Sequence, residues 1–287
     1  MGDRWHVFVR LIRTIWETGV IPQQMLWMIV VLLPKGGGDY RGMGLLEPFW
    51  KIIEVIMDGR LEVIDFHDSL HGFLKGRGTA TTATVEAKLA QQFAYLEQEP
   101  FYGIFVDLQK AYDAMDRDQC LVILKAYGVG PNMLRLVKHF WDEAVMACRA
   151  SGCYGAPFKA FCGVTQGRPL SPRLFNIMVD AVVREWMRRL LGDDACANGY
   201  GYAVWAFLAI FYADDAFVAA RDPVKLQRAL DILVDLFECV GLRMNTLKTK
   251  AMTCLPGKIR TRLSVSAYSN AREGLLTAYG RLQSCVD

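Results

Sequence analysis

Residues 203–220 have the sequence AVWAFLAIFYADDAFVAA, and this stretch decides the predicted fold. Two apolar runs flank Ala213-Asp214-Asp215, a pattern that predicts a β-hairpin whose turn carries two adjacent carboxylates. A single long helix is excluded, because it would bury two ionised side chains without partners. We therefore expect one strand on each side of the Asp-Asp pair.

A second apolar strand is predicted over FYGIFV, residues 101–106, and it ends at Asp107. Between residues 101 and 241 the predicted order is strand, helix, helix, strand, strand, helix. This order fits an α+β fold with a split β-α-β sheet and helices on one face.

Capping signals and apolar periodicity predict the helices. Asp116, with Gln119 three residues later, resembles a capping box and predicts a helix from Arg117 to Tyr127. Ser171-Pro172 and Asp222-Pro223 each open a helix with proline at its first position. The other predicted elements are an amphipathic helix within residues 1–20, a buried strand over 25–33, a glycine-dense loop or turn at 35–44, and helices over about 47–64 and 82–98.

The composition excludes several classes of protein. With 287 residues, 53% of them hydrophobic, and a net charge of +3, the chain is neither disordered nor histone-like. The eight cysteines form no Cys-x-x-Cys pair, so we interpret them as reduced thiols of a cytosolic or nuclear protein. No apolar run reaches the roughly 20 residues of a membrane span, and residues 1–20 have no signal-peptide pattern. We expect an intracellular protein without membrane contact.

The predicted strands bring three carboxylates together. If the sheet pairs these strands, Asp107 meets Asp214 and Asp215, and three like charges repel one another unless cations neutralise them. Oxygen ligands suit Mg²⁺ or Mn²⁺, and two such ions would clamp the attacking and leaving oxygens of a phosphoryl transfer. The alternative is that these acids are ordinary solvated charges in turns.

Six motifs in order resemble those of reverse transcriptases, and in particular the branch of non-long-terminal-repeat retrotransposons and group II intron proteins. They are LLPKGGGDYRGMGLLE (32–47), HGFLKGRGTATT (71–82), FVDLQKAYDAMD (105–116), GVTQGRPLSPRLFN (163–176), FYADD (211–215) and GLRMNTLKTK (241–250). The resemblance implies a polymerase-like palm with a ferredoxin-like antiparallel sheet, partial fingers, and a thumb that is largely absent. It divides the chain into a fingers-like region (1–100), a catalytic palm (101–255), and a basic tail or start of a thumb (256–287).

The resemblance also implies the residues of the catalytic site. Asp107 and Asp214 match the family's principal metal ligands, and Asp215 matches the adjacent carboxylate, which supports the metal site less directly. The backbone carbonyl of Leu108 would complete one metal shell. The implied cofactor is a pair of Mg²⁺ ions, with Mn²⁺ as a substitute. Lys248 matches the lysine that protonates the leaving pyrophosphate, although Lys250 is an alternative.

Further matches concern the substrate. Lys35 and Arg41 match finger residues that grip the triphosphate. Tyr112 matches the bulky residue that excludes a ribose 2′-OH, which implies dNTP substrates. Gln166 matches the residue that touches the nucleotide or the templating pair, and Gly167 lets the backbone approach the substrate.

Two positions depart from the family pattern. Arg41-Gly42-Met43-Gly44 stands where relatives have Arg-Pro-Ile-Ser, and we expect a looser loop there. Arg168 replaces a small residue or cysteine and is expected to place a cation beside the nucleotide or template.

Positive charge gathers near the end of the chain. Residues 239–272 contain no acid, and their seven cations would follow a phosphate backbone; these are Arg243, Lys248, Lys250, Lys258, Arg260, Arg262 and Arg272. The alternative is a solvated basic tail.

The resemblance therefore implies an RNA-directed DNA polymerase that extends a DNA primer on an RNA template with dNTPs. The alternative is an inactive, reverse-transcriptase-like module that binds RNA, such as the remnant of a truncated mobile element.

Overall fold

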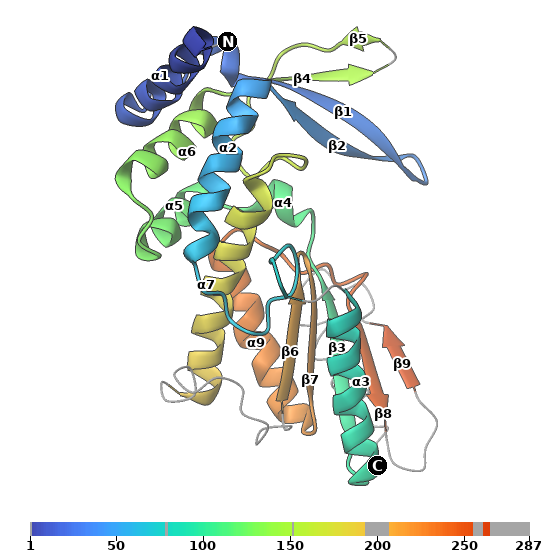
Figure 1. Cartoon of the computed structure of the whole chain (residues 1–287). Coiled ribbons are helices and arrows are strands. Elements are labelled where there is room, and N and C mark those ends of the chain that lie inside the picture. The colour runs from blue at the N-terminus through green and yellow to red at the C-terminus, as the bar shows by residue number, and fades with distance from the viewer. Residues whose placement is uncertain (1, 78–79, 151, 193–206, 255–260, 265–287) are drawn as a thin grey trace. The chain divides into compact units, whose positions relative to one another are not determined.

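The computed structural model describes residues 2–77, 80–150, 152–192, 207–254 and 261–264 (Figure 1). The chain forms two compact units, each made of two segments. Unit 1 comprises Met1–Asp65 and Met115–Met178, and unit 2 comprises Phe66–Ala114 and Val179–Asp287. Each unit is described by itself.

Unit 1 combines helices with a four-stranded sheet of order β2-β1-β4-β5. Its elements are α1 (Gly2–Thr18), η1 (Gln23–Leu26), β1 (Trp27–Gly36), β2 (Asp39–Leu46), α2 (Pro48–Arg60), η2 (Leu61–Val63), α5 (Arg117–Ala126), α6 (Pro131–Glu143), β4 (Val145–Ala150), β5 (Cys153–Tyr154) and the first part of α7 (Ser171–Leu191). Trp50 of α2 stacks on Phe140 of α6 at 5.1 Å between ring centroids. Both side chains are fully buried, so this pair fixes α2 against α6.

The glycine-dense stretch is mostly strand. Residues 35–44 were expected to form a loop or turn, but β1 and β2 pair as an antiparallel hairpin in which Leu33 faces Arg41 and Val30 faces Gly44. Only the tip of the hairpin is a turn. The looser loop expected behind Arg41 is therefore wrong, because strand pairing fixes the backbone of Arg41-Gly42-Met43-Gly44.

Unit 2 is built around a five-stranded antiparallel sheet of order β6-β7-β3-β8-β9. Its elements are α3 (Ala80–Leu96), β3 (Phe101–Asp107), α4 (Ala111–Ala114), the remainder of α7, β6 (Phe207–Tyr212), β7 (Asp215–Ala220), α9 (Pro223–Cys239), β8 (Lys250–Cys254) and β9 (Thr261–Ser264). The predicted hairpin around the Asp-Asp pair and the predicted strand over 101–106 are confirmed. Residues 203–206 of the quoted stretch lie outside the described residues.

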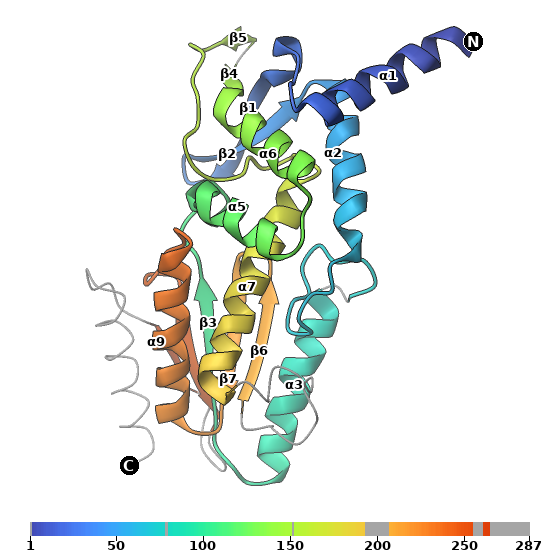
Figure 2. The same ribbon diagram turned by 90° about the vertical axis from the view of Figure 1, so that its left-hand side faces the viewer.

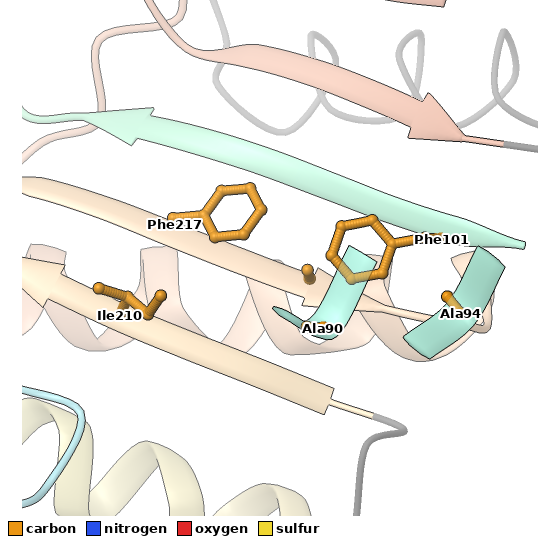
Figure 3. Close-up of a cluster of buried hydrophobic side chains, with 6 residues drawn as sticks. Ala90, Ala94, Phe101, Ile210 and Phe217 are labelled. Atoms are coloured by element: carbon orange, nitrogen blue, oxygen red, sulfur yellow. The ribbon is translucent and has the colours of Figure 1, made fainter. Parts of the chain in front are cut away.

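Helices pack on both faces of this sheet (Figures 1 and 2). On one face, Trp186 of α7 donates to the carbonyl of Ala229 of α9 at 2.7 Å and meets the edge of Phe211 of β6. On the other face, Ala90 and Ala94 of α3 pack on the sheet (Figure 3); the cluster also includes Phe101, Ile210, Phe217 and Ala219. The α+β fold is confirmed, and α3 adds a helix on the face that the prediction left open.

The predicted capping signals are present. Asp116 accepts a hydrogen bond from the backbone N–H of Gln119 at 2.9 Å, and Asp222 accepts one from Val224 at 2.8 Å. These carboxylates satisfy N–H groups that the first turn of a helix leaves unpaired. The six described cysteines are free. None of the helices in the described part of the chain combines the length and apolar character that crossing a membrane requires.

Candidate active site

The candidate catalytic carboxylates lie at one end of the sheet of unit 2. Asp107 is the last residue of β3, and it is the direct cross-strand partner of Asp215, the first residue of β7. Side chains at such paired positions point to the same face of a sheet and lie about 5 Å apart at Cβ. Asp214 precedes Asp215 in the turn after β6, where Ala213 adopts a left-handed conformation with φ of 55°. Asp107, which is distant in sequence from the adjacent Asp214 and Asp215, thus lies at the same end of the sheet as that pair.

The negative charges at this end of the sheet favour the binding of a cation. Oδ1 of Asp107 is buried and accepts no hydrogen bond from the described residues. The pKa of Asp215 is raised, first by burial and then by the neighbouring charges of Asp214 and Asp107, which Lys248 partly offsets. A carboxylate cluster with an unsatisfied buried oxygen is costly unless positive charge is supplied.

The carboxylates fit a divalent ion that also uses substrate oxygens. Among the residues that the structure describes, no three His, Cys, Asp or Glu side chains form a ready-made metal site. One or two carboxylates are nevertheless a common protein contribution to a Mg²⁺ site, which phosphate oxygens and water complete. Asp107 and Asp215 are cross-strand partners, and Asp214 directly precedes Asp215 in the turn.

Tyr112 lies beside the carboxylates on the short helix α4. Its side chain is buried, and its pKa is raised by burial and by the charge of Asp214. The ring is therefore held in its neutral form close to the acidic turn. Such a position suits a residue that excludes part of a substrate sterically.

Of the two candidate lysines, Lys248 lies closer to the acids. Its Nζ is 3.9 Å from Oδ1 of Asp107, and the side chain is 64% exposed. Lys250 is instead the cross-strand partner of Phe105, two residues before Asp107. The segment before Lys248 is fixed to the end of β3, because Asn245 donates its backbone N–H to the carbonyl of Asp107 at 2.7 Å.

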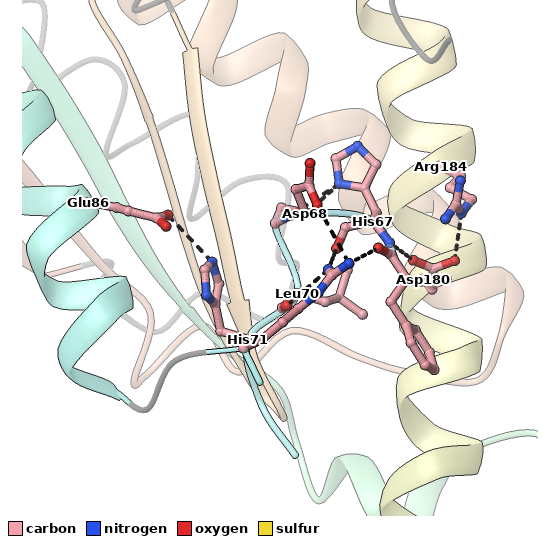
Figure 4. Close-up of polar contacts among 10 residues, drawn as sticks. His67, Asp68, Leu70, His71, Glu86, Asp180 and Arg184 are labelled. Carbon is pink, nitrogen blue, oxygen red and sulfur yellow. Dashed lines mark hydrogen bonds and ion pairs between the residues drawn. The ribbon is translucent and has the colours of Figure 1, made fainter. Parts of the chain in front are cut away.

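The supporting segment, residues 66–77 after η2, lies against the end of β6 and the acidic turn. Figure 4 shows polar contacts of this segment. Ser69 accepts a backbone hydrogen bond from Phe211 at 2.8 Å, and His71 donates one to the same residue at 2.9 Å. A Cβ added to Gly72 would lie 2.5 Å from the backbone nitrogen of Ala213, which is closer than real Cβ contacts. The backbone at Gly72 therefore lies directly against the turn that carries Asp214.

Buried polar groups hold this supporting segment (Figure 4). Asp180 of α7 is fully buried; its Oδ1 accepts from the backbone N–H of His67 at 2.6 Å and its Oδ2 from Nε of Arg184 at 2.6 Å. Arg77 donates to the carbonyls of Phe66 and His67. Sequence reasoning missed Asp180, because its partner lies 113 residues away in the chain.

The remaining candidate residues belong to unit 1. Lys35 and Arg41 are exposed on the β1–β2 hairpin. Gln166 is half-buried in the loop before α7, and its carbonyl accepts from the backbone N–H of Gly44 at 2.8 Å. Gly167 follows it and is exposed. A backbone hydrogen bond thus joins the hairpin to the Gln166 loop.

The expectation for Arg168 is wrong. The side chain is 4% exposed and forms an ion pair with the fully buried Glu54 of α2, so it does not offer a cation to a ligand. Its guanidinium also lies over the ring of Phe140, 4.1 Å from the centroid. A buried carboxylate compensates for the charge, and the sequence could not reveal this because the two residues are 114 positions apart.

Only part of the predicted basic segment is described. Arg243 and Lys248 are exposed, and Lys250 is half-buried on β8. Lys258, Arg260 and Arg272 lie outside the described residues. The prediction that this segment follows a phosphate backbone stays a prediction.

The comparison with protein families agrees with the site. The model described as "Reverse transcriptase (RNA-dependent DNA polymerase)" matches residues 33–273, which include all three carboxylates. The chain belongs to the reverse transcriptase family. The predicted membership is confirmed, and a two-metal phosphoryl transfer is the general mechanism of this family.

Similar proteins come from mobile elements. The chain is 26% identical over 248 residues to a Pol polyprotein from the type-2 retrotransposable element R2DM of Drosophila melanogaster, covering 84% of this chain and 23% of that protein. It is 25% identical to the RNA-directed DNA polymerase from mobile element jockey of Drosophila funebris, covering 83% of this chain and 26% of the relative. The chain therefore spans only about a quarter of the length of these curated relatives.

Solved structures of telomerase share the fold. Telomerase from Candida tropicalis in complex with a TWJ fragment of telomeric RNA matches with a TM-score of 0.62 and 16% identity, over 93% of this chain and 47% of that one. The apo telomerase truncated from its C-terminal domain matches with a TM-score of 0.59 and 16% identity, over 92% and 56% of the two chains. At this identity the likeness concerns the fold alone.

Proposed function

We propose that this chain is the polymerase part of an RNA-directed DNA polymerase from a mobile genetic element. In the proposed reaction a primer 3′-OH attacks the α-phosphate of a dNTP opposite an RNA template, and pyrophosphate leaves. The observation that supports it best is the pairing of Asp107 with Asp215 beside Asp214, with an unsatisfied buried oxygen on Asp107. Membership in the reverse transcriptase family supports the same reading.

The carboxylates have the central role in this proposal. Asp107, Asp214 and Asp215 would hold two Mg²⁺ ions, with Mn²⁺ as a substitute and the carbonyl of Leu108 as a further ligand. The bound ions would stabilise the negative charge that develops on the phosphoryl group. Lys248 would donate a proton to the leaving pyrophosphate, since its ammonium is the closer of the two candidates to Asp107.

Substrate selection would use further residues that match the family motifs. In unit 2, Tyr112 would exclude the ribose 2′-OH by volume. In unit 1, Lys35 and Arg41 would bind the triphosphate, while Gln166 and Gly167 would contact the nucleotide or the templating pair. The division into fingers (1–100), palm (101–255) and basic tail (256–287) stays a prediction, as does an intracellular location.

Primer extension tests the proposal. We expect Asp107→Asn and Asp214→Asn to abolish incorporation of dTMP on a poly(rA) template with an oligo(dT) primer and Mg²⁺, while RNA binding is retained. A matched control is Asp142→Asn, which removes an exposed carboxylate paired with Lys138 on α6 and should leave extension unchanged. Equal extension by the unsubstituted chain and both site variants would refute the metal-ligand assignment.

The same assay distinguishes a polymerase from an inactive module that binds RNA. If the unsubstituted chain binds the template but incorporates no dTMP with either Mg²⁺ or Mn²⁺ over a range of protein concentrations, the chain is an RNA-binding module rather than a polymerase. Incorporation that depends on the three carboxylates excludes the module.

A further inference from the structure

Arg168 forms a buried polar cluster in unit 1 that the reaction itself does not use. Nε of Arg168 donates to Oε1 of Glu54 at 3.0 Å, and a second guanidinium nitrogen contacts the same oxygen. Nε1 of Trp50 donates to that oxygen as well, at 2.9 Å. Phe140 lies between the two donors, stacked on Trp50 and covered by the guanidinium. The side chains therefore form a closed set of mutual contacts between α2, α6 and the loop before α7.

This cluster is adjacent to the segment that carries Gln166. The loop is held at two further points, because Ser171 donates its hydroxyl to the carbonyl of Thr165 at 2.8 Å and Gly44 donates its N–H to the carbonyl of Gln166 at 2.8 Å. A Cβ at Gly44 would lie 2.6 Å from Cγ2 of Thr165, so a larger residue would require that side chain to shift. Arg168 lies two residues after Gln166 and forms an ion pair with Glu54 of α2.

If the Arg168–Glu54 pair only stabilised the fold, it would not need to be charged. Replacing a buried ion pair by apolar residues of similar volume is often neutral or stabilising, because burying two charges costs nearly as much as their attraction returns. A guanidinium fork, however, fixes direction as well as distance, since its donors have a rigid planar geometry. The pair is thus better suited to setting the position of the loop than to adding stability.

We propose that Arg168, anchored on Glu54, is a positioning residue that fixes the backbone of Gln166 and Gly167 against the β1–β2 hairpin, and so sets the geometry with which this loop meets the nucleotide. The inference rests on the proposed function, in which Gln166 contacts substrate. It assigns Arg168 an indirect role, because its buried side chain cannot touch a ligand.

The test uses a double variant in which neither member of the ion pair carries a charge. Arg168→Met alone would leave the Glu54 carboxylate buried and unpaired, and that variant is prone to misfolding. Glu54→Gln combined with Arg168→Met removes both charges, and the glutamine oxygen still accepts from Trp50. We expect the melting temperature of the double variant to stay close to that of the unsubstituted chain.

Two readouts report the position of the loop. We expect KM for dTTP to rise about tenfold with little change in kcat, since uniform binding of the nucleotide is lost. We also expect hydrogen exchange of the Gly44 amide to accelerate about tenfold, because its acceptor is the Gln166 carbonyl.

The matched control is a second ion pair that joins α2 to α7. Nε of Arg173, in the first turn of α7, donates to Oδ1 of Asp58 on α2 at 2.8 Å. The variant Asp58→Asn with Arg173→Met should change neither KM nor Gly44 exchange.

The outcomes distinguish the positioning role of Arg168 from the proposed polymerase activity. A stable double variant with unchanged Gly44 exchange overturns the positioning role, and faster exchange with an unchanged KM overturns its consequence for the nucleotide. If the unsubstituted chain incorporates no dTMP, the proposed function fails, while exchange at Gly44 still decides whether Arg168 positions the loop.

Discussion

Replacing Gly72 by alanine tests whether the supporting segment sets the position of the acidic turn. The added Cβ would lie 2.5 Å from the backbone nitrogen of Ala213 and 3.2 Å from the carbonyl carbon of Tyr212. Ordinary contact begins near 3.4 Å, so one backbone must move by about 0.9 Å. Neither neighbour is a flexible side chain, and this displacement would be transmitted to Asp214, the next residue after Ala213.

The size of the effect follows from this displacement. Overpacking of this kind costs about 1–3 kcal/mol of stability. A misplacement of about 1 Å at a reacting centre costs on the order of 10²-fold in rate. We therefore expect Gly72→Ala to lower kcat for dTMP incorporation about 100-fold while the protein remains folded.

The assay compares Gly72→Ala with Gly59→Ala in primer extension over a range of Mg²⁺ concentrations. Gly59 lies in α2, and a Cβ there meets nothing within 4 Å. Alanine at that position should stabilise the helix by about 0.5–1 kcal/mol and leave activity unchanged. If Gly72→Ala retains both the melting temperature and the activity of the unsubstituted chain, the argument that Gly72 positions the turn is refuted.

Three further predictions concern single side chains of the same site. Tyr112→Val should raise ribonucleotide incorporation about tenfold relative to dNTPs, and equal discrimination by both forms in competition assays would contradict the role of the ring. Lys248→Ala should lower kcat about 100-fold, whereas Lys250→Ala should have a smaller effect; the reverse order in single-turnover kinetics would assign the proton donor to Lys250. Burial, and then the charges of Asp214 and Asp107, raise the pKa of Asp215. Asp215→Asn removes the partly buried charge and its repulsion, so it should raise the melting temperature in the absence of divalent ions and lower activity. A lower melting temperature would contradict that repulsion.

The elements of the fold were predictable where the signal is local. Asp116 and Asp222 cap the helices that their spacing predicts. The two apolar runs around Asp214-Asp215 form β6 and β7. In these cases each residue interacts with neighbours a few positions away, and the pattern carries the information needed.

Helix α3 shows where periodicity misleads. The predicted helix was recognised from large apolar residues, yet Val85 and Leu89 are each nearly half exposed, at 48% and 47%. The residues that pack on the sheet are Ala90 and Ala94 (Figure 3). Small side chains allow the helix to approach the rings of Phe101 and Phe217 closely, and hydrophobicity alone does not distinguish that face.

The candidate site could be predicted only in part for a related reason. Asp107 and Asp215 were recognisable because each stands at the end of an apolar strand. Asp180 gave no such signal, because an acid within an amphipathic helix looks like a solvated residue until its distant partner at His67 is known.

Arg168 is a second residue whose partner is distant in sequence. Burying either the Glu54 carboxylate or the Arg168 guanidinium without the other would cost several kcal/mol. Each charge is therefore stable in this site only because its partner is present. A reverse transcriptase with a small residue at the position of Arg168 would leave an acid at position 54 buried and unpaired. Such a protein must therefore carry an uncharged residue at position 54 or open that site to water. We therefore predict that the departure from the family pattern at Arg168 is accompanied by a change at position 54 in α2, and relatives that keep a buried acid there beside a small residue would contradict this.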